Sequence, residues 1–338
     1  MSDTDQPMVS ILTPVHNGAT YLRECIESVL RQTYRNWEYV IVDNRSTDET
    51  LAIAEEYARR DSRIRVITNK NLVGVITNHN IAFQEMSSTS RFCKVVHADD
   101  WLFPECVEKM VEVAMANPSI GLVSAYTLEG TKIRLDGLAY PSGFVCGRQI
   151  ARAWFLGGPL AFGCPTWSMV RSDIVRRARP FYNKQSINAD TEAGFAVLTQ
   201  SDFGFVHQVL TFTRLHEQSV TSRNTLLDPF LPGHLVIVLK YGPVFLTATE
   251  FAAKRRVYMR EYYSCLARRA LRVNQSEYWK FHKESLKRLG ISVSLLRIAA
   301  TVPIEIAKLC FSPKRLRRMM RSRLVTSRQA SGDAVRDL

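Results

Sequence analysis

The chain has 338 residues, of which 46% are apolar and 23% charged, with a formal net charge of +13. This length and composition suit one large α/β domain with an appendage, or two domains, and argue against extensive disorder. The seven cysteines show no CxxC spacing, which argues against a disulfide scaffold or a zinc site and fits the reducing cytosol.

Basic charge is concentrated at the C-terminal end of the chain. Residues 235–338 contain 22 Lys/Arg and 7 Asp/Glu, whereas the first 234 residues contain 23 and 25. No aromatic-rich basic stripe accompanies this charge, so a nucleic acid is not an expected partner. Residues 1–8 are polar and acidic and do not resemble a signal peptide, so we expect a cytoplasmic protein.

Strands and helices alternate through the first third of the chain. Apolar runs predict strands at 9–15, 39–42, 64–68, 92–97 and 120–125. Helical spacing predicts helices at 21–30, 51–58, 75–86 and 104–116. This alternation predicts an α/β fold with a mostly parallel central sheet flanked by helices. The pattern is less regular over 128–213, and the chain beyond 223 is predicted to be helical.

Polar side chains follow three of the predicted strands, at Asn17, Asp43 and Asp99. Ligands of parallel sheets bind beyond the carboxyl ends of the strands, so these residues are expected to share one site. In the run His97-Ala98-Asp99-Asp100, two adjacent carboxylates are costly to bury unless a cation neutralises them. Hard oxygen ligands select Mg²⁺ or Mn²⁺, which usually arrive with a substrate phosphate. The sequence therefore predicts a metal–diphosphate site.

Four motifs in order resemble the nucleotide-sugar site of family 2 glycosyltransferases, which have the GT-A fold. They are Thr13-Pro14-Val15-His16-Asn17, Asp43-x-x-Ser46-x-Asp48-x-Thr50, Asn71-x-x-Gly74-x-x-x-Asn78-x-Asn80, and Asp99-Asp100 followed by Pro104. The resemblance implies a GT-A domain over 1–225, with a nucleotide-binding half at 1–125 and an acceptor half at 126–225. Residues 226–338 would then form a basic helical C-terminal region.

The activity that this resemblance implies is metal-dependent inverting transfer of a sugar. The donor would be a UDP-, GDP- or dTDP-sugar, with Mg²⁺ or Mn²⁺ as cofactor. The acceptor would be a hydroxyl of a glycan or lipid-linked molecule in cell-envelope or polysaccharide synthesis. Two alternatives stay open: a nucleotide-sugar-binding protein without catalysis, and a nucleotidyltransferase, although Val15–Ala19 matches the Gly-rich signature of the latter poorly.

The resemblance also implies which residues hold the donor. Thr13 and Pro14 would shape the base pocket through backbone atoms, with Asn17 and Ser46 beside them. Asp43 would accept a hydrogen bond from the base or the ribose, or would instead belong only to a turn with Ser46 and Asp48. Asn78 and Asn80 would lie near the diphosphate, or would merely open a helix.

For the metal, the family usually shows Asp-x-Asp, where this chain has His97 and then Asp99. Asp99 is the expected ligand, and Asp100 is a second ligand or holds the following loop. His97 either bonds the ribose or is a histidine satisfied within its strand. Arg214-Leu215-His216 resembles the family's Arg-x-His turn, in which Arg214 would clamp the diphosphate and His216 would complete the metal shell. Both side chains can also be ordinary loop residues.

An inverting displacement needs one carboxylate to take the proton of the acceptor hydroxyl. The run 188–192 lies where the family often has a Glu-Asp pair that opens a helix. Asp190 is the expected base and Glu192 the competitor, whereas Ala189 stands in place of the usual Glu. The alternative is an acidic helix cap.

The C-terminal end suggests a membrane contact. Residues 291–311 are mostly apolar but include Arg297, Glu305 and Lys308, with Pro303 inside, which suits an interfacial amphipathic helix rather than a spanning one. Six basic residues between Lys314 and Arg323 are suited to anionic lipid. We therefore expect a protein that is cytoplasmic or peripheral on the cytoplasmic face of the membrane. A soluble helical tail or a dimer helix is the alternative.

Overall fold

The computed structural model describes residues 6–135, 138–216, 227–270 and 276–310. By its internal contacts the chain divides into two compact units, residues 1–251 and 252–338. The predicted domain boundary near residue 225 stays a prediction, because residues 217–226 lie outside the described residues.

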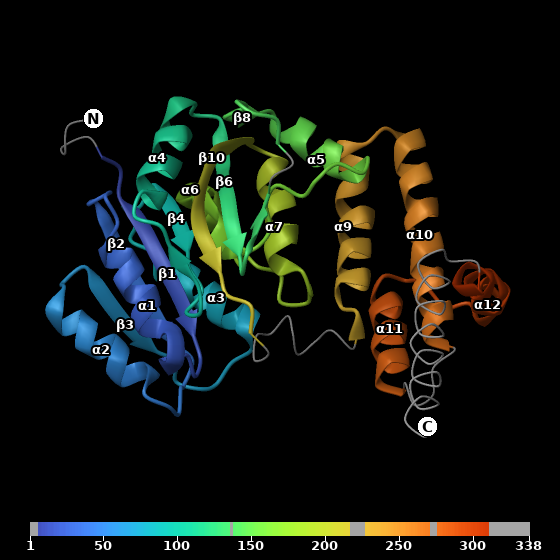
Figure 1. The fold of residues 1–338 in the computed structure, drawn as a ribbon, viewed down its shortest axis with the longest axis horizontal. Coiled ribbons are helices and arrows are strands. Elements are labelled where there is room, and N and C mark those ends of the chain that lie inside the picture. Colours follow the sequence, from blue (N-terminus) through green and yellow to red (C-terminus); the bar gives the residue numbers. More distant parts are fainter. Residues whose placement is uncertain (1–5, 136–137, 217–226, 271–275, 311–338) are drawn as a thin grey trace, which may run out of the picture. The chain divides into compact units, whose positions relative to one another are not determined.

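The first unit alternates strands and helices along the chain (Figure 1). Its first part contains β1 (Val9–Val15), α1 (Ala19–Leu30), β2 (Trp37–Asp43), α2 (Thr50–Arg60), β3 (Ile64–Thr68), α3 (Val75–Gln84), β4 (Phe92–Val95), β5 (Trp101–Leu102) and α4 (Cys106–Ala116). Its second part contains β6 (Ile120–Glu129), β7 (Lys132–Arg134), β8 (Phe144–Val145), α5 (Gly147–Phe155), the short 3₁₀ helix η2 (Pro165–Trp167), β9 (Ser168–Arg171), α6 (Ser172–Arg177), α7 (Ala189–Leu198), β10 (Asp202–Thr213) and α9 (Phe230–Phe245).

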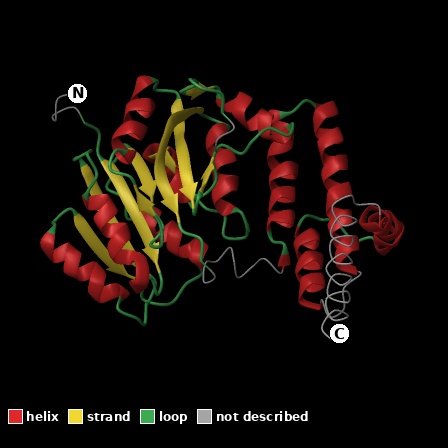
Figure 2. Cartoon of the chain, viewed as in Figure 1, coloured by secondary structure: helices red, strands yellow, loops and turns green. Residues whose placement is uncertain are grey.

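One sheet runs through this unit (Figure 2). Its strand order is β3-β2-β1-β4-β9-β6-β10-β5. β3, β2, β1 and β4 are parallel neighbours, which agrees with the mostly parallel sheet that was predicted, and β6 is parallel to β10. β9 is antiparallel to both β4 and β6, and this short strand has no counterpart among the predicted elements. It joins the two halves of the sheet, so the carboxyl end of β4 faces residues from the second half of the chain.

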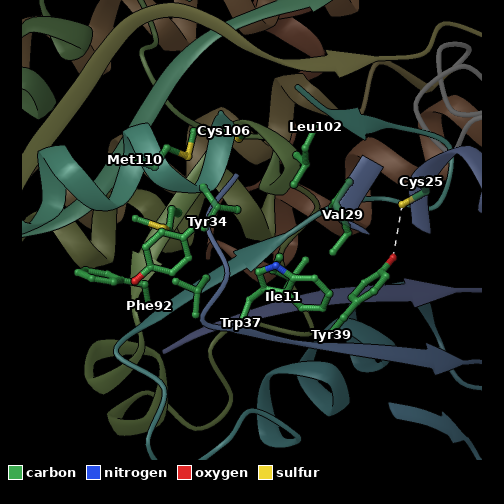
Figure 3. Close-up of a cluster of buried hydrophobic side chains, with 14 of the residues drawn as sticks. Ile11, Cys25, Val29, Tyr34, Trp37, Tyr39, Phe92, Leu102, Cys106 and Met110 are labelled. Carbon is green, nitrogen blue, oxygen red and sulfur yellow. Dashed lines mark hydrogen bonds between the residues drawn. The ribbon is translucent and has the colours of Figure 1, made fainter. Parts of the chain in front are cut away.

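The core beneath the sheet explains why these segments fold as they do. β1 is buried at all seven positions, as expected of a strand covered on both faces. Tyr39, Trp37 and Ile11 pack with the buried face of α1, whose Leu22, Cys25, Ile26 and Val29 recur at helical spacing (Figure 3). The hydroxyl of Tyr39 lies 2.8 Å from Thr13 Oγ1, so this buried polar pair is satisfied within the core.

The C-terminal helices are α10 (Ala248–Ala270), α11 (Ser276–Arg288) and α12 (Leu295–Cys310). Inside the second unit, the buried hydroxyl of Tyr262 lies 2.8 Å from His282 Nδ1, which ties α10 to α11. Arg268 and Lys308 both pair with the buried Glu305, which ties α10 to α12. Among the described helices, none combines the length and the apolar character that a membrane span requires.

Candidate functional site

The loops after β1 and β2 are bonded to each other at the carboxyl edge of the sheet. Asn17 has a positive φ of 52°, which its short polar side chain tolerates. Its backbone N–H donates to Ser46 Oγ over 2.9 Å, and its side-chain oxygen accepts from the backbone N–H of Thr47 over 2.8 Å. The buried Asp43 carboxylate accepts from the backbone N–H of Ser46 over 3.2 Å. The structure thus brings Asn17, Asp43 and Ser46 together.

A buried network of asparagine amides supports these loops from below. Asn69 donates to Asn78 Oδ1 over 2.8 Å and to Asn44 Oδ1 over 2.9 Å. Asn80 bonds the backbone of Tyr182 at both ends of its amide, each over 2.8 Å. Both Asn78 and Asn80 are therefore engaged with protein groups, and motif reading gave no signal for Asn44 or Asn69.

Thr13 and Pro14 lie in β1 and are buried. Thr13 Oγ1 donates to the carbonyl oxygen of Val96 over 2.8 Å, next to the end of β4. This bond fixes the spacing of β1 and β4 at the edge where the polar loops begin. The Thr13 side chain thereby serves the fold, and the pocket-shaping role expected of Thr13 and Pro14 through their backbone atoms stays a prediction.

His97 is held by two groups that the motifs do not show. Its backbone N–H donates to Thr166 Oγ1 over 3.1 Å, and its Nε2 lies 3.2 Å from His79 Nε2. His79 Nδ1 lies 2.9 Å from the Val75 carbonyl and must donate to it, so its Nε2 accepts the proton of His97 Nε2. His97 Nδ1 lies 3.8 Å from Asp100 Oδ2. Burial, with His97 adding to it, lowers the pKa of His79 to about 3.

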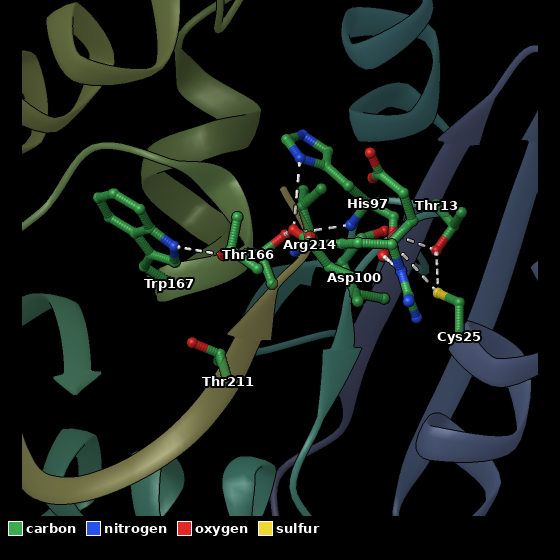
Figure 4. Close-up of polar contacts among 12 residues, drawn as sticks. Thr13, Cys25, His97, Asp100, Thr166, Trp167, Thr211 and Arg214 are labelled. Atoms are coloured by element: carbon green, nitrogen blue, oxygen red, sulfur yellow. Dashed lines mark hydrogen bonds and ion pairs between the residues drawn. The ribbon is translucent and has the colours of Figure 1, made fainter. Parts of the chain in front are cut away.

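Asp100 is buried at the centre of the site (Figure 4). Thr166 Oγ1 donates to its Oδ2 over 2.6 Å, and the backbone N–H of Arg214 donates to its Oδ1 over 3.0 Å. Burial raises the pKa of this carboxyl, and the charge of neighbouring Asp99 adds to the rise. The buried Lys94 holds the Thr166 segment in place by donating to the carbonyl oxygens of Thr166 and Ser168. Asp100 therefore anchors the loop that carries Arg214.

Asp99 and His216 form an open pair beside this anchor. Asp99 Oδ2 lies 2.8 Å from His216 Nε2, and their side chains are 32% and 19% exposed. Arg214 Nε donates to the Asp99 carbonyl, while the guanidinium pairs with Glu24 and lies 4.3 Å from the centre of the Tyr21 ring. The partly exposed Asp99 carboxylate offers the oxygen ligand that Mg²⁺ and Mn²⁺ prefer, and His216 Nε2 places a nitrogen donor beside it. These residues therefore fit the expected cation.

A second group of possible ligand atoms lies deeper. Among the described residues, the donor atoms of His97, Asp100 and Cys164 lie within 4.8 Å of one another. Burial, and then the charges of Asp100 and Asp190, raise the pKa of the Cys164 thiol well above its ordinary value. A thiol that stays protonated at neutral pH is a poor ligand for a hard cation, so the Asp99–His216 pair is the better cation site.

The start of α7 presents the two carboxylates predicted as bases, and they lie in different surroundings. Asp190 is partly exposed, accepts a hydrogen bond from the Thr191 N–H over 2.6 Å and forms no ion pair among the described residues. Glu192 is buried, and its Oε1 lies 2.6 Å from Lys240 Nζ on α9. Asp190 lines a cavity together with Pro165 and Ser168, which flank the Thr166 segment that holds Asp100.

Comparisons with known proteins agree with this architecture. The model for glycosyl transferase family 2 matches residues 10–178. A Bacillus subtilis protein named as the glycosyltransferase EpsH is 38% identical over 111 residues, which is 32% of this chain and 31% of EpsH. A glycosyltransferase of Rickettsia prowazekii is 24% identical over 310 residues, or 86% of this chain and 95% of that protein. The O-antigen biosynthesis protein RfbC of Myxococcus xanthus is 35% identical over 120 residues, or 35% of this chain and 9% of RfbC.

Solved structures share the fold at low identity. Staphylococcus aureus TarS 1–349 in complex with UDP-GlcNAc has a TM-score of 0.63 and 15% identity, covering 88% of this chain and 84% of that one. The mannosyltransferase PcManGT of Pyrobaculum calidifontis, in complex with GDP-Man and Mn²⁺, has a TM-score of 0.55 and 15% identity, covering 96% and 86%. The first unit therefore has the expected GT-A architecture.

Proposed function

The chain belongs to glycosyl transferase family 2, and we propose that it transfers a sugar from a nucleotide-diphosphate sugar with inversion, using a bound Mg²⁺ or Mn²⁺. The observation that carries this proposal is the open Asp99–His216 pair at the carboxyl edge of the parallel strands. A carboxylate and an imidazole at this edge suit a cation that arrives with a diphosphate.

The donor end of the proposed site is built from the loops after β1 and β2. A carboxylate can accept about four hydrogen bonds. Both oxygens of the Asp43 carboxylate accept from one donor, the backbone N–H of Ser46. It can therefore also accept from a base N–H or a ribose hydroxyl. TarS and PcManGT were solved with UDP-GlcNAc and GDP-Man, which supports a nucleotide-sugar donor here. In this proposal Asn78 and Asn80 hold the wall of the donor cleft through their bonds to protein groups.

Asp190 is proposed as the base of the transfer. It takes the proton of the acceptor hydroxyl while that oxygen forms a bond to the anomeric carbon, and the bond from this carbon to the diphosphate breaks. The nucleotide diphosphate leaves with the electron pair, and when bound the cation offsets its charge. Glu192 is the weaker candidate because its carboxylate is buried against Lys240. Arg214 holds the Asp99 loop by donating to the Asp99 carbonyl, and its guanidinium is proposed to clamp the diphosphate.

The acceptor proposed is a glycan or lipid-linked hydroxyl of cell-envelope or polysaccharide synthesis, at the cytoplasmic face of a membrane. The relative RfbC is named for O-antigen biosynthesis, which favours this class. The basic run from Lys314 to Arg323, expected to touch anionic lipid, lies outside the described residues. The apolar segment before it lies largely in α12.

A donor panel tests the proposal without knowledge of the acceptor. Thermal unfolding would be measured with UDP-, GDP- and dTDP-sugars and their diphosphates, with and without Mn²⁺. A ligand that binds the native state raises the midpoint by mass action, so one nucleotide should stabilise the protein, more strongly with Mn²⁺. No stabilisation by any of them would overturn the proposal.

Variants then separate binding from chemistry. Slow donor hydrolysis, in which water replaces the acceptor, is followed by release of the nucleotide diphosphate. Asp190→Asn should keep donor stabilisation and lose about 10²- to 10⁴-fold in hydrolysis rate, whereas Asp99→Asn should lose the Mn²⁺-dependent stabilisation. Glu112→Gln, on the surface of α4, is the matched control. If Asp190→Asn hydrolyses the donor as fast as the native chain does, Asp190 is not the base.

The same assays separate the alternatives. A binding protein without catalysis would be stabilised by the donor but would release no nucleotide diphosphate even with an acceptor extract. A nucleotidyltransferase would release pyrophosphate from a nucleoside triphosphate and a sugar phosphate.

A further inference from the structure

A groove of about 600 Å³ lies between α10 and α12 in the second unit. Four arginines line it, three from α10 and one from α12: Arg255, Arg256, Arg260 and Arg297. The other lining residues are Ala252, Met259, Tyr263, Ile291, Ala300 and Thr301, none of them acidic. The groove therefore combines apolar walls with a concentration of positive charge.

These arginines are exposed, and none of them forms an ion pair with a residue in the described part of the chain. The unit has few acids to offer, since residues 252–310 contain 13 Lys/Arg and 4 Asp/Glu. The buried Glu305 is already paired with Arg268 and Lys308. Like charges gathered in one groove repel one another, and an anion bound there relieves that repulsion.

One half of α12 is apolar, and the other described residues of the chain leave it uncovered. Its exposed apolar side chains are Leu295, Leu296, Ala299, Ala300, Pro303, Ile304, Ile306 and Ala307, with Leu295 75% and Leu296 85% exposed. At about 100° per residue these positions fall within one half of the helix circumference. Arg297 and Lys308 border that half, and the buried Ile298 and Glu305 lie on the opposite side.

We propose that this surface of α10 and α12 is where the protein contacts an anionic membrane. The apolar half of α12 lies in the bilayer interface, and the four groove arginines bind the phosphates of lipid headgroups. A helix that is apolar on one side and flanked by cations has this preference, and arginine pairs with phosphate through two parallel hydrogen bonds. This inference rests on the proposed function, and it assigns the membrane contact to residues of α10 and α12 rather than to the 314–323 run.

Two other occupants fit the charges less well. A second copy of the chain related by a two-fold axis would place its own arginine groove against this one, and the two positive surfaces would repel each other. The segment 311–338 contains 8 Lys/Arg and 2 Asp/Glu, so its own charge opposes binding to the groove. A lipid phosphate supplies the missing negative charge, and the acyl region accepts the apolar half of α12.

The test is sedimentation of the full chain with vesicles of phosphatidylcholine, with and without phosphatidylglycerol. Three full-chain variants each remove three positive charges: a groove variant (R255Q, R256Q, R260Q), an α11 control (K283Q, K287Q, R288Q) and a tail variant (K314Q, R315Q, R318Q). At about 1 kcal/mol per cation near the surface, the groove variant should bind mixed vesicles more than about tenfold more weakly. The α11 control should stay within about threefold of the native chain.

Leu296→Asp tests the apolar half and should also weaken binding. Equal binding by the groove variant, or a loss confined to the tail variant, would overturn the inference. So would a native dimer that Leu296→Asp converts to a monomer, since a second copy would then cover this surface. Donor stabilisation in the thermal panel should be unchanged in every variant, which shows that the first unit is folded and separates this test from that of the proposed function.

Discussion

Acidification should destabilise the first unit through His79. This buried histidine has a pKa of about 3 in the folded chain, against an ordinary value of 6.5. Between these values the unfolded chain binds a proton at this position that the native chain does not, so stability rises with pH in this window. The contribution is complete above pH 6.5 and is lost as the pH falls toward 3.

The size of the effect follows from the shift. Each pH unit below 6.5 costs about 1.4 kcal/mol, so lowering the pH from 6.5 to 4.5 should remove about 2–3 kcal/mol of unfolding free energy through this group. The physical cost is either a charged imidazole in the core or the loss of its contact with His97.

The free energy of unfolding at each pH is measured by urea unfolding, with tryptophan fluorescence as the signal. Four of the five tryptophans, at positions 37, 101, 154 and 167, lie in the first unit. His79→Gln cannot take up the proton, so its loss of stability between pH 6.5 and 4.5 should be smaller than that of the native chain by the amount above. His207→Gln, a histidine outside this pair, controls for removing an imidazole. Parallel pH curves for the native chain and His79→Gln would refute the reasoning.

Three further substitutions test other contacts, each by urea unfolding. Lys240→Met leaves the buried Glu192 carboxylate without its cation, so it should lower the free energy of unfolding by about 1–3 kcal/mol. Adding Glu192→Gln to this variant should recover part of that loss. If nothing is recovered, the broken ion pair is not the cause of the loss. Gly194→Ala places a Cβ 2.5 Å from the buried Phe162 ring, so it should lower the free energy of unfolding by about 1–3 kcal/mol. Gly74→Ala is the control: nothing surrounds its Cβ, and the free energy of unfolding should change by less than about 1 kcal/mol. Thr166→Val removes the hydroxyl that donates a hydrogen bond to the buried Asp100, so it should lower the free energy of unfolding by about 1–3 kcal/mol. It should also weaken the Mn²⁺-dependent stabilisation by the nucleotide sugar. If that stabilisation is unchanged, the position of Asp100 does not depend on Thr166.

Local signals were enough to determine the strand–helix order of the first 126 residues, except for the two-residue strand β5. Apolar runs such as Val9–Val15 and the helical spacing within 21–30 are properties of neighbouring residues, and their alternation predicts parallel strands, although not the order of those strands in the sheet. Because parallel strands end at one edge, the polar residues Asn17, Asp43 and Asp99 could be assigned to one edge of the sheet. The order of the motifs was enough to indicate the family.

Only the tertiary structure decided what surrounds each of these residues. Thr166 reaches Asp100 across 66 positions of sequence, and the short antiparallel strand β9 that brings it there is too brief for periodicity to reveal. From the sequence, Asp190 is the expected base and Glu192, two residues further on, is the competitor, but the sequence pattern does not show how the surroundings of the two differ. Lys240, 48 positions further along the chain, forms an ion pair with the buried Glu192, and no ion pair to Asp190 is found among the described residues. Such differences come from desolvation and long-range charge pairing, which depend on distances in the folded chain and leave no pattern among neighbouring residues.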